Sequence, residues 1–201
     1  MAASCPVLVL PGLGAGDGST IAIRTQLRFA GHVTHTWNQG RNDANFAEIV
    51  PALTSRFLDL ADRHQGEVAV VGWSLGGIYA CHLATSFPAI VRQVVTLGSQ
   101  LRSSTDVVPA SSGPSSSGPS SSVPLTSIWT RADRVVPWRR SAIEPSDRAE
   151  NIEVRATHLT LGFDPFVLGA IVDRLAQDPA DWRPFRPAPW LRAAYPRPPR
   201  S

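Results

Sequence analysis

The sequence predicts an α/β fold, a mostly parallel six-stranded sheet with helices on both faces. Two observations point to it. Short apolar runs of the kind that form buried strands alternate along the chain with longer segments whose apolar residues recur at helical spacing. Glycine and proline separate the two kinds of segment, as expected at turns. This alternation is typical of strand–helix–strand units, which build parallel sheets.

The individual elements follow from local patterns. The expected strands, in chain order, are 7–10, 33–37, 68–71, 91–97, 125–129 and 152–154. The expected helices are 20–30, 46–66, a segment starting at Leu75, and 165–176. Gly31 should end the first helix. Pro51 interrupts the apolar pattern of the second, so it should either kink that helix or mark a late start.

Composition is that of a single globular domain. The chain has 201 residues, of which 43% are hydrophobic. No apolar run approaches the ~20 residues that span a bilayer, so no stable membrane insertion is expected. No basic segment followed by an apolar stretch opens the chain, and a cytoplasmic location is therefore expected. The two cysteines, Cys5 and Cys81, are expected to be free. The oligomeric state is left open.

The C-terminal end differs from the rest of the chain in its net charge. All 19 basic residues are arginine, and five of them follow Asp181, where no acidic residue occurs. Residues 1–181, the expected domain, keep 14 basic against 16 acidic residues, a net charge of −2. The Pro/Arg-rich tail, 182–201, could bind nucleic acid or an anionic surface. We favour a solvated extension that packs Trp182 and Phe185 onto the body, with no nucleic-acid partner.

Residues 103–122 differ in kind from the rest. Ten of these twenty residues are serine, and the five residues 113–117 are repeated unchanged at 118–122. Such a composition cannot bury enough apolar surface to order itself, which predicts a flexible loop. The exact repeat is compatible with either a native loop or an engineered linker.

The segment Gly72-Trp73-Ser74-Leu75-Gly76 lies between a predicted strand and a predicted helix. In that setting, Gly-x-Ser-x-Gly places the serine hydroxyl on a sharp turn at the end of a sheet, and the flanking glycines relieve the crowding. A serine hydroxyl is a weak nucleophile at neutral pH. It needs a histidine to take its proton and a carboxylate to orient that histidine.

Two histidines follow Ser74. His82 falls inside the next helix and cannot reach back to the serine, whereas His158 falls in a loop between a strand and a helix. His158 is therefore the expected base. The expected acid is Asp133, because it runs out of the strand at 125–129 and an apolar segment anchors its loop. Asp106, within the serine-rich segment, and Glu144 are the alternatives.

A developing oxyanion would need hydrogen-bond donors. The strand at 7–10 ends in Pro11-Gly12-Leu13-Gly14, whose glycines allow the backbone to approach a reacting oxygen. The amide of Leu13 is one expected donor. The amide of Leu75, directly after the nucleophile and at a helix start, is the second.

Together these motifs resemble the α/β-hydrolase superfamily, and within it the bacterial lipase/esterase branch with its small lidless members. The matching stretches are 10–14, 72–77, 127–137 and 157–159, within a resemblance that runs from residue 7 to about 176. Two positions depart from the family pattern. Pro11 stands where a histidine often precedes the oxyanion loop, and Trp73 replaces the usual histidine of the elbow.

The resemblance implies hydrolysis of short- to medium-chain acyl esters through an acyl-enzyme on Ser74, without metal or organic cofactor. Small-molecule or lipid esters would be the substrates, and Trp73 and Leu159 would line the pocket. It also implies that residues 103–122 stand in place of a lid. An acyltransferase on the same scaffold, or a non-catalytic binding protein, remains an alternative.

Overall fold

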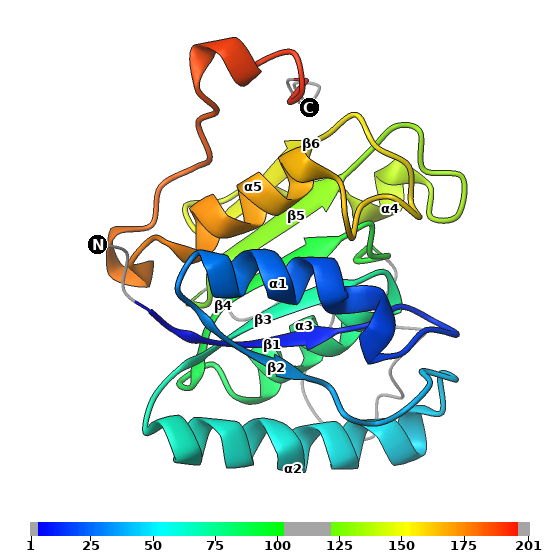
Figure 1. Ribbon diagram of the computed structural model, residues 1–201, viewed down its shortest axis with the longest axis vertical. Helices are drawn as coiled ribbons and strands as arrows, with labels where there is room; N and C mark the ends of the chain where they lie inside the picture. Colours follow the sequence, from blue (N-terminus) through cyan, green and yellow to red (C-terminus); the bar gives the residue numbers. More distant parts are fainter. Residues whose placement is uncertain (1–3, 103–121, 197–201) are drawn as a thin grey trace.

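The structure is a computed structural model that describes residues 4–102 and 122–196. Its centre is a six-stranded sheet with the strand order β2-β1-β3-β4-β5-β6, and every neighbouring pair is parallel (Figure 1). The strands are β1 (Pro6–Leu10), β2 (Val33–Thr36), β3 (Val68–Trp73), β4 (Val91–Leu97), β5 (Leu125–Trp129) and β6 (Ala149–Glu153). The predicted fold class is confirmed.

Helices cover both faces of this sheet. They are α1 (Ile21–Phe29), α2 (Phe46–His64), α3 (Leu75–Ser86), α4 (Trp138–Ser141) and α5 (Pro165–Leu175), with short 3-10 helices η1 (Asp17–Thr20), η3 (Pro179–Asp181) and η4 (Pro189–Leu191). Helices α1 and α5 pack on one face, and α2 and α3 on the other (Figure 1). The short α4 has no counterpart among the predicted elements.

The first strand shows how the sequence builds two cores. Successive side chains of a strand point to opposite faces. Val7 and Val9 therefore join the cluster under α1 and α5, while Leu8 and Leu10 join the cluster under α2 and α3. All four are fully buried. Because helices cover both faces, the strand reads as a continuous apolar run rather than an alternating one.

Pro51 lies inside α2, which begins at Phe46 and continues to His64. The alternative of a late helix start is therefore wrong. Proline lacks the amide hydrogen that would bond to the carbonyl of Ala47, one turn earlier, and its ring crowds that carbonyl. That carbonyl lies in the first turn, near the helix end, where water can replace one missing bond. The buried face formed by Ile49, Leu53 and Phe57 holds the helix against the sheet on both sides of the proline.

The chain after Asp181 contacts the body at Phe185 and again over 191–195, while Trp190 between them is exposed. Phe185 and Tyr195 contact the cluster under α1 and α5, and the Tyr195 hydroxyl donates to the carbonyl of Phe166 at 2.7 Å. A buried ion pair fastens the start of this segment: Arg174 contacts Glu150 at 2.8 Å, and Glu150 also accepts from the Phe185 amide.

The predictions for 103–121 and for residues 197–201 fall outside the described residues. No helix of the described part is long and apolar enough to cross a membrane.

Candidate active site

The turn at Ser74 joins β3 to α3 and has a strained backbone. Ser74 has φ 53° and ψ −118°, a conformation that non-glycine residues rarely adopt. A Cβ at Gly72 would overlap the carbonyl of Gly76, and a Cβ at Gly76 would overlap the carbonyl of Leu10. Both flanking positions therefore require glycine. The turn presents the Ser74 side chain at the carboxyl ends of the central strands, where ligands bind in open α/β sheets.

Three predicted residues come together at this edge of the sheet. The Ser74 Oγ lies 3.0 Å from Nε2 of His158, and Nδ1 of His158 lies 2.6 Å from Oδ2 of Asp133. His158 and Asp133 are both buried, with 6% and 9% of their surfaces exposed. Serine, imidazole and carboxylate thus form one hydrogen-bonded chain, although 84 and 25 positions separate the paired residues in sequence.

The loop after β5 fixes the carboxylate of Asp133. Its Oδ1 accepts hydrogen bonds from the amides of Val135 at 2.8 Å and Val136 at 2.7 Å. This leaves Oδ2 to accept from His158. A carboxylate can only accept here, so Nδ1 of His158 carries the hydrogen and the lone pair of Nε2 faces the serine hydroxyl. That tautomer is the one able to take a proton from Ser74.

The other candidate acids and bases lie elsewhere. Glu144 contacts Arg102 at 3.4 Å, and its side chain is 80% exposed. Asp106 is outside the described residues. His82 lies within α3, and burial lowers the pKa of its imidazole. Among the described residues, no group of three or more His, Cys, Asp or Glu side chains is placed to hold a metal ion.

Gly98 is a site residue that sequence reasoning missed. It follows β4 directly and has φ +56°. A Cβ there would lie 3.0 Å from Oδ2 of Asp133 and 3.1 Å from Nδ1 of His158, the two atoms that share the hydrogen bond. The available signal was a glycine immediately after the predicted strand 91–97, at the same edge of the sheet as Ser74.

The segment after β1 passes close to the serine. A Cβ at Gly12 would lie 3.2 Å from Cβ of Ser74. The neighbouring amides are engaged elsewhere: Gly14 donates to the carbonyl of Asn42 at 2.6 Å, and Ala15 donates to that of Gly12. In the described part of the chain, the Leu13 amide between them has no such hydrogen bond. The Leu75 amide opens α3, before the first intrahelical bonds form.

Asn42 braces this segment and was also missed. It is fully buried, and its Nδ2 donates to the carbonyl of Pro11 at 3.0 Å. Its backbone amide donates to the carbonyl of Ala15 at 2.8 Å, and its carbonyl accepts from Gly14. No local pattern marks Asn42, because its side chain bonds to a residue 31 positions away.

The two predicted pocket residues lie next to the histidine. The indole Nε1 of Trp73 donates to the carbonyl of His158 at 3.1 Å, and its ring packs so closely on Gly162 that a Cβ there would lie 2.6 Å away. Trp73 thus supports the loop that carries His158. The Leu159 side chain is exposed. Three further exposed apolar side chains, on the loops around the site, are Leu13, Val135 and Phe163.

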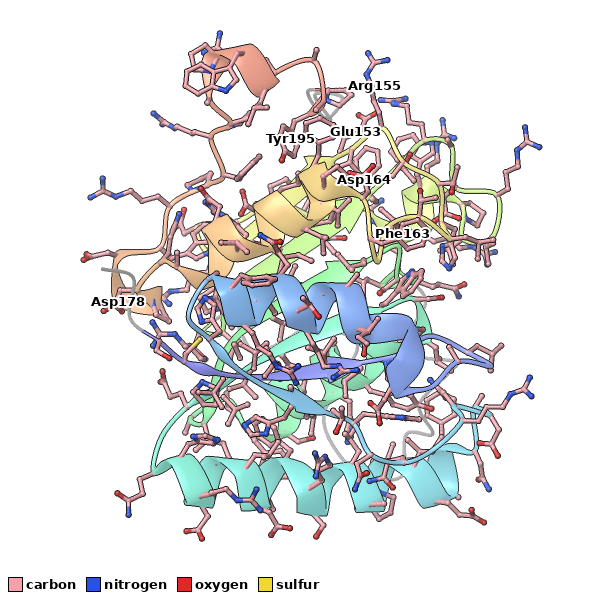
Figure 2. All side chains as sticks on the ribbon, in the orientation of Figure 1. Glu153, Arg155, Phe163, Asp164, Asp178 and Tyr195 are labelled. Atoms are coloured by element: carbon pink, nitrogen blue, oxygen red, sulfur yellow. The ribbon has the colours of Figure 1, made fainter. Side chains whose placement is uncertain are left out.

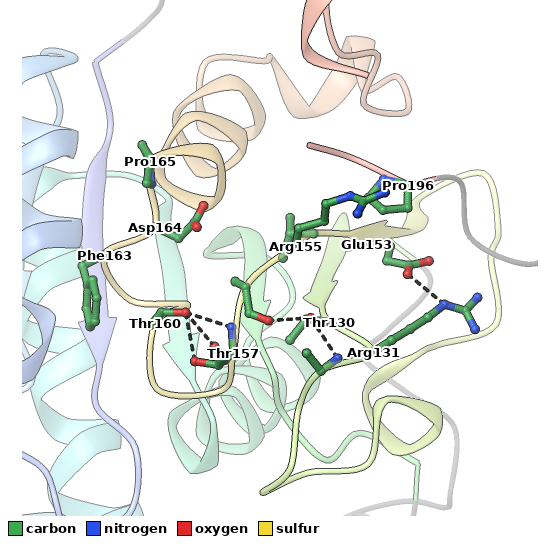
Figure 3. Close-up of a pocket in the computed structure, with 13 residues that line it drawn as sticks. Thr130, Arg131, Glu153, Arg155, Thr157, Thr160, Phe163, Asp164, Pro165 and Pro196 are labelled. Atoms are coloured by element: carbon green, nitrogen blue, oxygen red, sulfur yellow. Dashed lines mark hydrogen bonds and ion pairs between the residues drawn. The ribbon is translucent and has the colours of Figure 1, made fainter. Parts of the chain in front are cut away.

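A separate cavity of about 790 Å³ lies beside this loop (Figure 3). Its lining comes from 130–132, 153–157, 160, 163–165 and 196. Figure 2 shows its labelled members Glu153, Arg155, Phe163 and Asp164 near the end of β6 and the start of α5. Ser74, Asp133 and His158 are not among the lining residues, so this cavity is distinct from the candidate active site.

No family model matches the sequence, and no curated protein matches it. The structure, in contrast, is similar to several solved ones. A pyrethroid hydrolase from Sphingobium faniae shares 16% identity at a TM-score of 0.66, covering 90% of this chain and all of that one. Lipase B from Aspergillus fumigatus has 18% sequence identity and a TM-score of 0.67, and the match covers 89% of this chain and 55% of the lipase. A monoacylglycerol lipase from Paleococcus ferrophilus has 16% sequence identity and a TM-score of 0.63, and the match covers 85% of this chain and 93% of the lipase. With a sheet of this order and parallel pairing, the chain has the α/β-hydrolase fold.

Proposed function

We propose that this protein is a serine carboxylic-ester hydrolase that forms an acyl-enzyme on Ser74. The observation that carries the proposal is the hydrogen-bonded chain from Ser74 through His158 to Asp133. The strained turn at Ser74 adds to it, because such strain persists only where the surrounding structure enforces it.

The proposed reaction has two halves. Ser74 Oγ attacks the ester carbonyl while Nε2 of His158 takes its proton, and the imidazolium gives that proton to the departing alcohol as the carbon–oxygen bond breaks. Water then attacks the acyl-enzyme, gives a proton to His158 and releases the acid, and the proton returns to Ser74. Asp133 holds the imidazole in the reactive tautomer and stabilises its positive charge in both halves.

The amides of Leu13 and Leu75 are the proposed donors to the oxyanion. Gly12 brings its segment against Ser74, and the Leu75 amide lies at the positive end of the α3 dipole. Donors of this kind typically contribute about 10²–10³ in rate each. The mechanism needs no metal or organic cofactor, because the protein groups supply both the proton transfer and the charge stabilisation.

Small-molecule or lipid esters with short to medium acyl chains are the proposed substrates. The exposed side chains of Leu13, next to Gly12 in the segment after β1, and of Leu159, next to His158, offer apolar surface to an acyl chain, and Trp73 supports the loop that carries Leu159. The structurally similar proteins are named as a pyrethroid hydrolase and as lipases. An open site without a lid is part of the proposal and rests on the composition of 103–122.

Labelling with a fluorophosphonate probe tests the nucleophile. The wild type should be labelled once, at Ser74, and should hydrolyse nitrophenyl esters of graded chain length. Ser74→Ala should abolish labelling and lower kcat by ~10⁴-fold or more, as should His158→Ala for kcat. Ser86→Ala, at the exposed far end of α3, is the matched control and should behave as wild type. A wild type that neither reacts with the probe nor hydrolyses any ester would favour a non-catalytic binding protein.

The acid is tested separately. Asp133→Asn should lower kcat, because the asparagine amide can donate to Nδ1 of His158 and so favours the wrong tautomer. The decrease in kcat should be smaller than that caused by Ser74→Ala. Glu144→Gln should leave the rate unchanged. Full activity in Asp133→Asn would mean that another carboxylate orients His158.

A further inference from the structure

Two loops leave the sheet side by side and carry the acid and the base. The acid loop, 130–137, follows β5 and holds Asp133; the base loop, 154–164, follows β6 and holds His158. The last ladder pair between these strands is Trp129 with Glu153, followed by a hydrogen bond from the Val154 amide to the carbonyl of Trp129 at 2.9 Å. Beyond that point the loops are no longer held together by the sheet.

We propose that Thr130 is a positioning residue that fixes the acid loop to the base loop. Its hydroxyl donates to the carbonyl of Ala156 at 2.8 Å and accepts from the amide of Ala132 at 3.2 Å (Figure 3). Ala156 stands two residues before His158, and Ala132 stands directly before Asp133. The Thr130 carbonyl accepts from the Asp133 amide as well, at 3.2 Å. The inference rests on the proposed function.

Thr130 is only 1% exposed, so removing its hydroxyl would leave the amide of Ala132 and the carbonyl of Ala156 without this partner. In the described part of the chain, two hydrogen bonds join the acid loop to the base loop past Val154. One is the Thr130–Ala156 bond, and the other is the Asp133–His158 bond itself. An ion pair of Arg131 with Glu153 at 2.8 Å also ties the acid loop to the last residue of β6. Apart from the Asp133–His158 bond itself, the Thr130–Ala156 bond is the link between the loops that lies nearest to His158 in sequence.

The base loop is stiff, so a shift at Ala156 would be transmitted to His158. The Thr160 hydroxyl accepts from the Thr157 amide at 2.8 Å, and the Leu161 amide donates to the Thr157 carbonyl at 3.1 Å. These bonds close a tight turn that contains His158, and Figure 3 shows the contacts between Thr157 and Thr160. The cavity of about 790 Å³ borders Thr130, Ala156 and this turn. On that side of the base loop, no packed side chain of the described residues holds the loop in place.

Thr130→Val tests the proposal, because valine keeps the shape and removes both hydrogen bonds. We expect kcat to fall about 10- to 100-fold with KM nearly unchanged, as for other residues that orient catalytic groups. Thr130→Ser, which restores the hydroxyl, should return kcat close to the wild-type value. If Thr130→Val does not fold, Thr130→Ala removes the same bonds with a smaller side chain.

Thr126→Val is the matched control. Thr126 lies on β5, the strand that leads to Thr130, is equally buried, and donates a similar bond to Glu150 at 3.0 Å, but it stands at the far end of β5 from the site. Both valine variants should lose stability, and only Thr130→Val should lose kcat. Unchanged kcat in folded Thr130→Val, or equal losses of kcat in the two variants, would overturn the proposal.

A spectroscopic measurement separates this inference from the proposed function. The proton between Nδ1 of His158 and Asp133, at 2.6 Å, should give a far-downfield proton resonance in the wild type. Thr130→Val should shift or broaden it, and Thr126→Val should not. This readout needs no substrate. An inactive wild type whose resonance responds to Thr130→Val would refute the proposed function alone, whereas an unaltered resonance would refute the role of Thr130.

Discussion

Gly98→Ala should disturb the contact between acid and base without touching either residue. The new methyl would lie 3.0 Å from Oδ2 of Asp133 and 3.1 Å from Nδ1 of His158, while ordinary contact begins at 3.4 Å. The two atoms must therefore move away by about 0.4 Å and 0.3 Å. Because a misplacement of about 1 Å costs about 10²-fold, shifts of this size should lower kcat by about 4- to 6-fold.

The same substitution also strains the backbone. Gly98 has φ +56°, and a side chain in the left-handed region costs about 1–2 kcal/mol. Alanine recovers about 0.4–1 kcal/mol by restricting the unfolded chain. The net loss of unfolding free energy should be roughly 1 kcal/mol, plus whatever the Cδ1 atom of Leu161, 2.8 Å from the new methyl, costs to move.

Ester-hydrolysis kinetics and denaturant unfolding measure the two effects. Gly31→Ala is the matched control, since Gly31 also has a positive φ, of +92°, and a methyl there meets no atom within 4 Å. It should lose stability and keep its kcat. If Gly98→Ala kept full kcat while losing as much stability as Gly31→Ala, the tight geometry between Asp133 and His158 would be irrelevant to the rate, and the reasoning would be refuted.

Two further predictions concern the oxyanion segment and pH. Asn42→Ala should cost roughly 1–3 kcal/mol of unfolding free energy by stranding the buried carbonyl of Pro11. It should also lower kcat more than it raises KM; steady-state kinetics with kcat unchanged would contradict it. The pKa of His35 is lowered to about 4 by burial and by His64, Arg56, Arg63 and Arg28. Between these two pKa values, His35 is protonated in the unfolded chain, where its pKa is near 6.5, but stays neutral in the folded one. The free energy of unfolding should therefore fall as pH drops from about 6.5 to about 4. Unfolding midpoints across this range should fall less in His35→Gln, and equal falls would exclude His35 as a source.

Much of the fold could be read from the chain because its signals are local. The buried run Val7–Leu10, the helical spacing from Phe46 to Leu60, and the Gly72–Gly76 turn each depend on neighbours within a few residues. The exceptions have physical reasons. Pro51 alone could not reveal that tertiary packing holds α2 in one piece, and α4 is a single turn, too short to leave a periodic pattern.

For the candidate site, the sequence indicated which residues would carry the proposed chemistry but not what aligns them. Turn and strand patterns pointed to Ser74, Asp133 and His158 as residues at the same edge of the sheet. Asn42 and Thr130 carry no such pattern, and Gly98 is marked only as a glycine after a predicted strand, because each acts through a contact with a segment at least 26 residues away.

The sequence by itself determined the order of the elements and the chemical groups available, since hydrophobic period and turn chemistry are properties of short segments. The tertiary structure decided the distances: 3.0 Å from serine to imidazole and 2.6 Å from imidazole to carboxylate. Such distances depend on how distant segments pack around two buried cores and on which buried polar groups bridge them. A single sequence does not encode that in any local pattern.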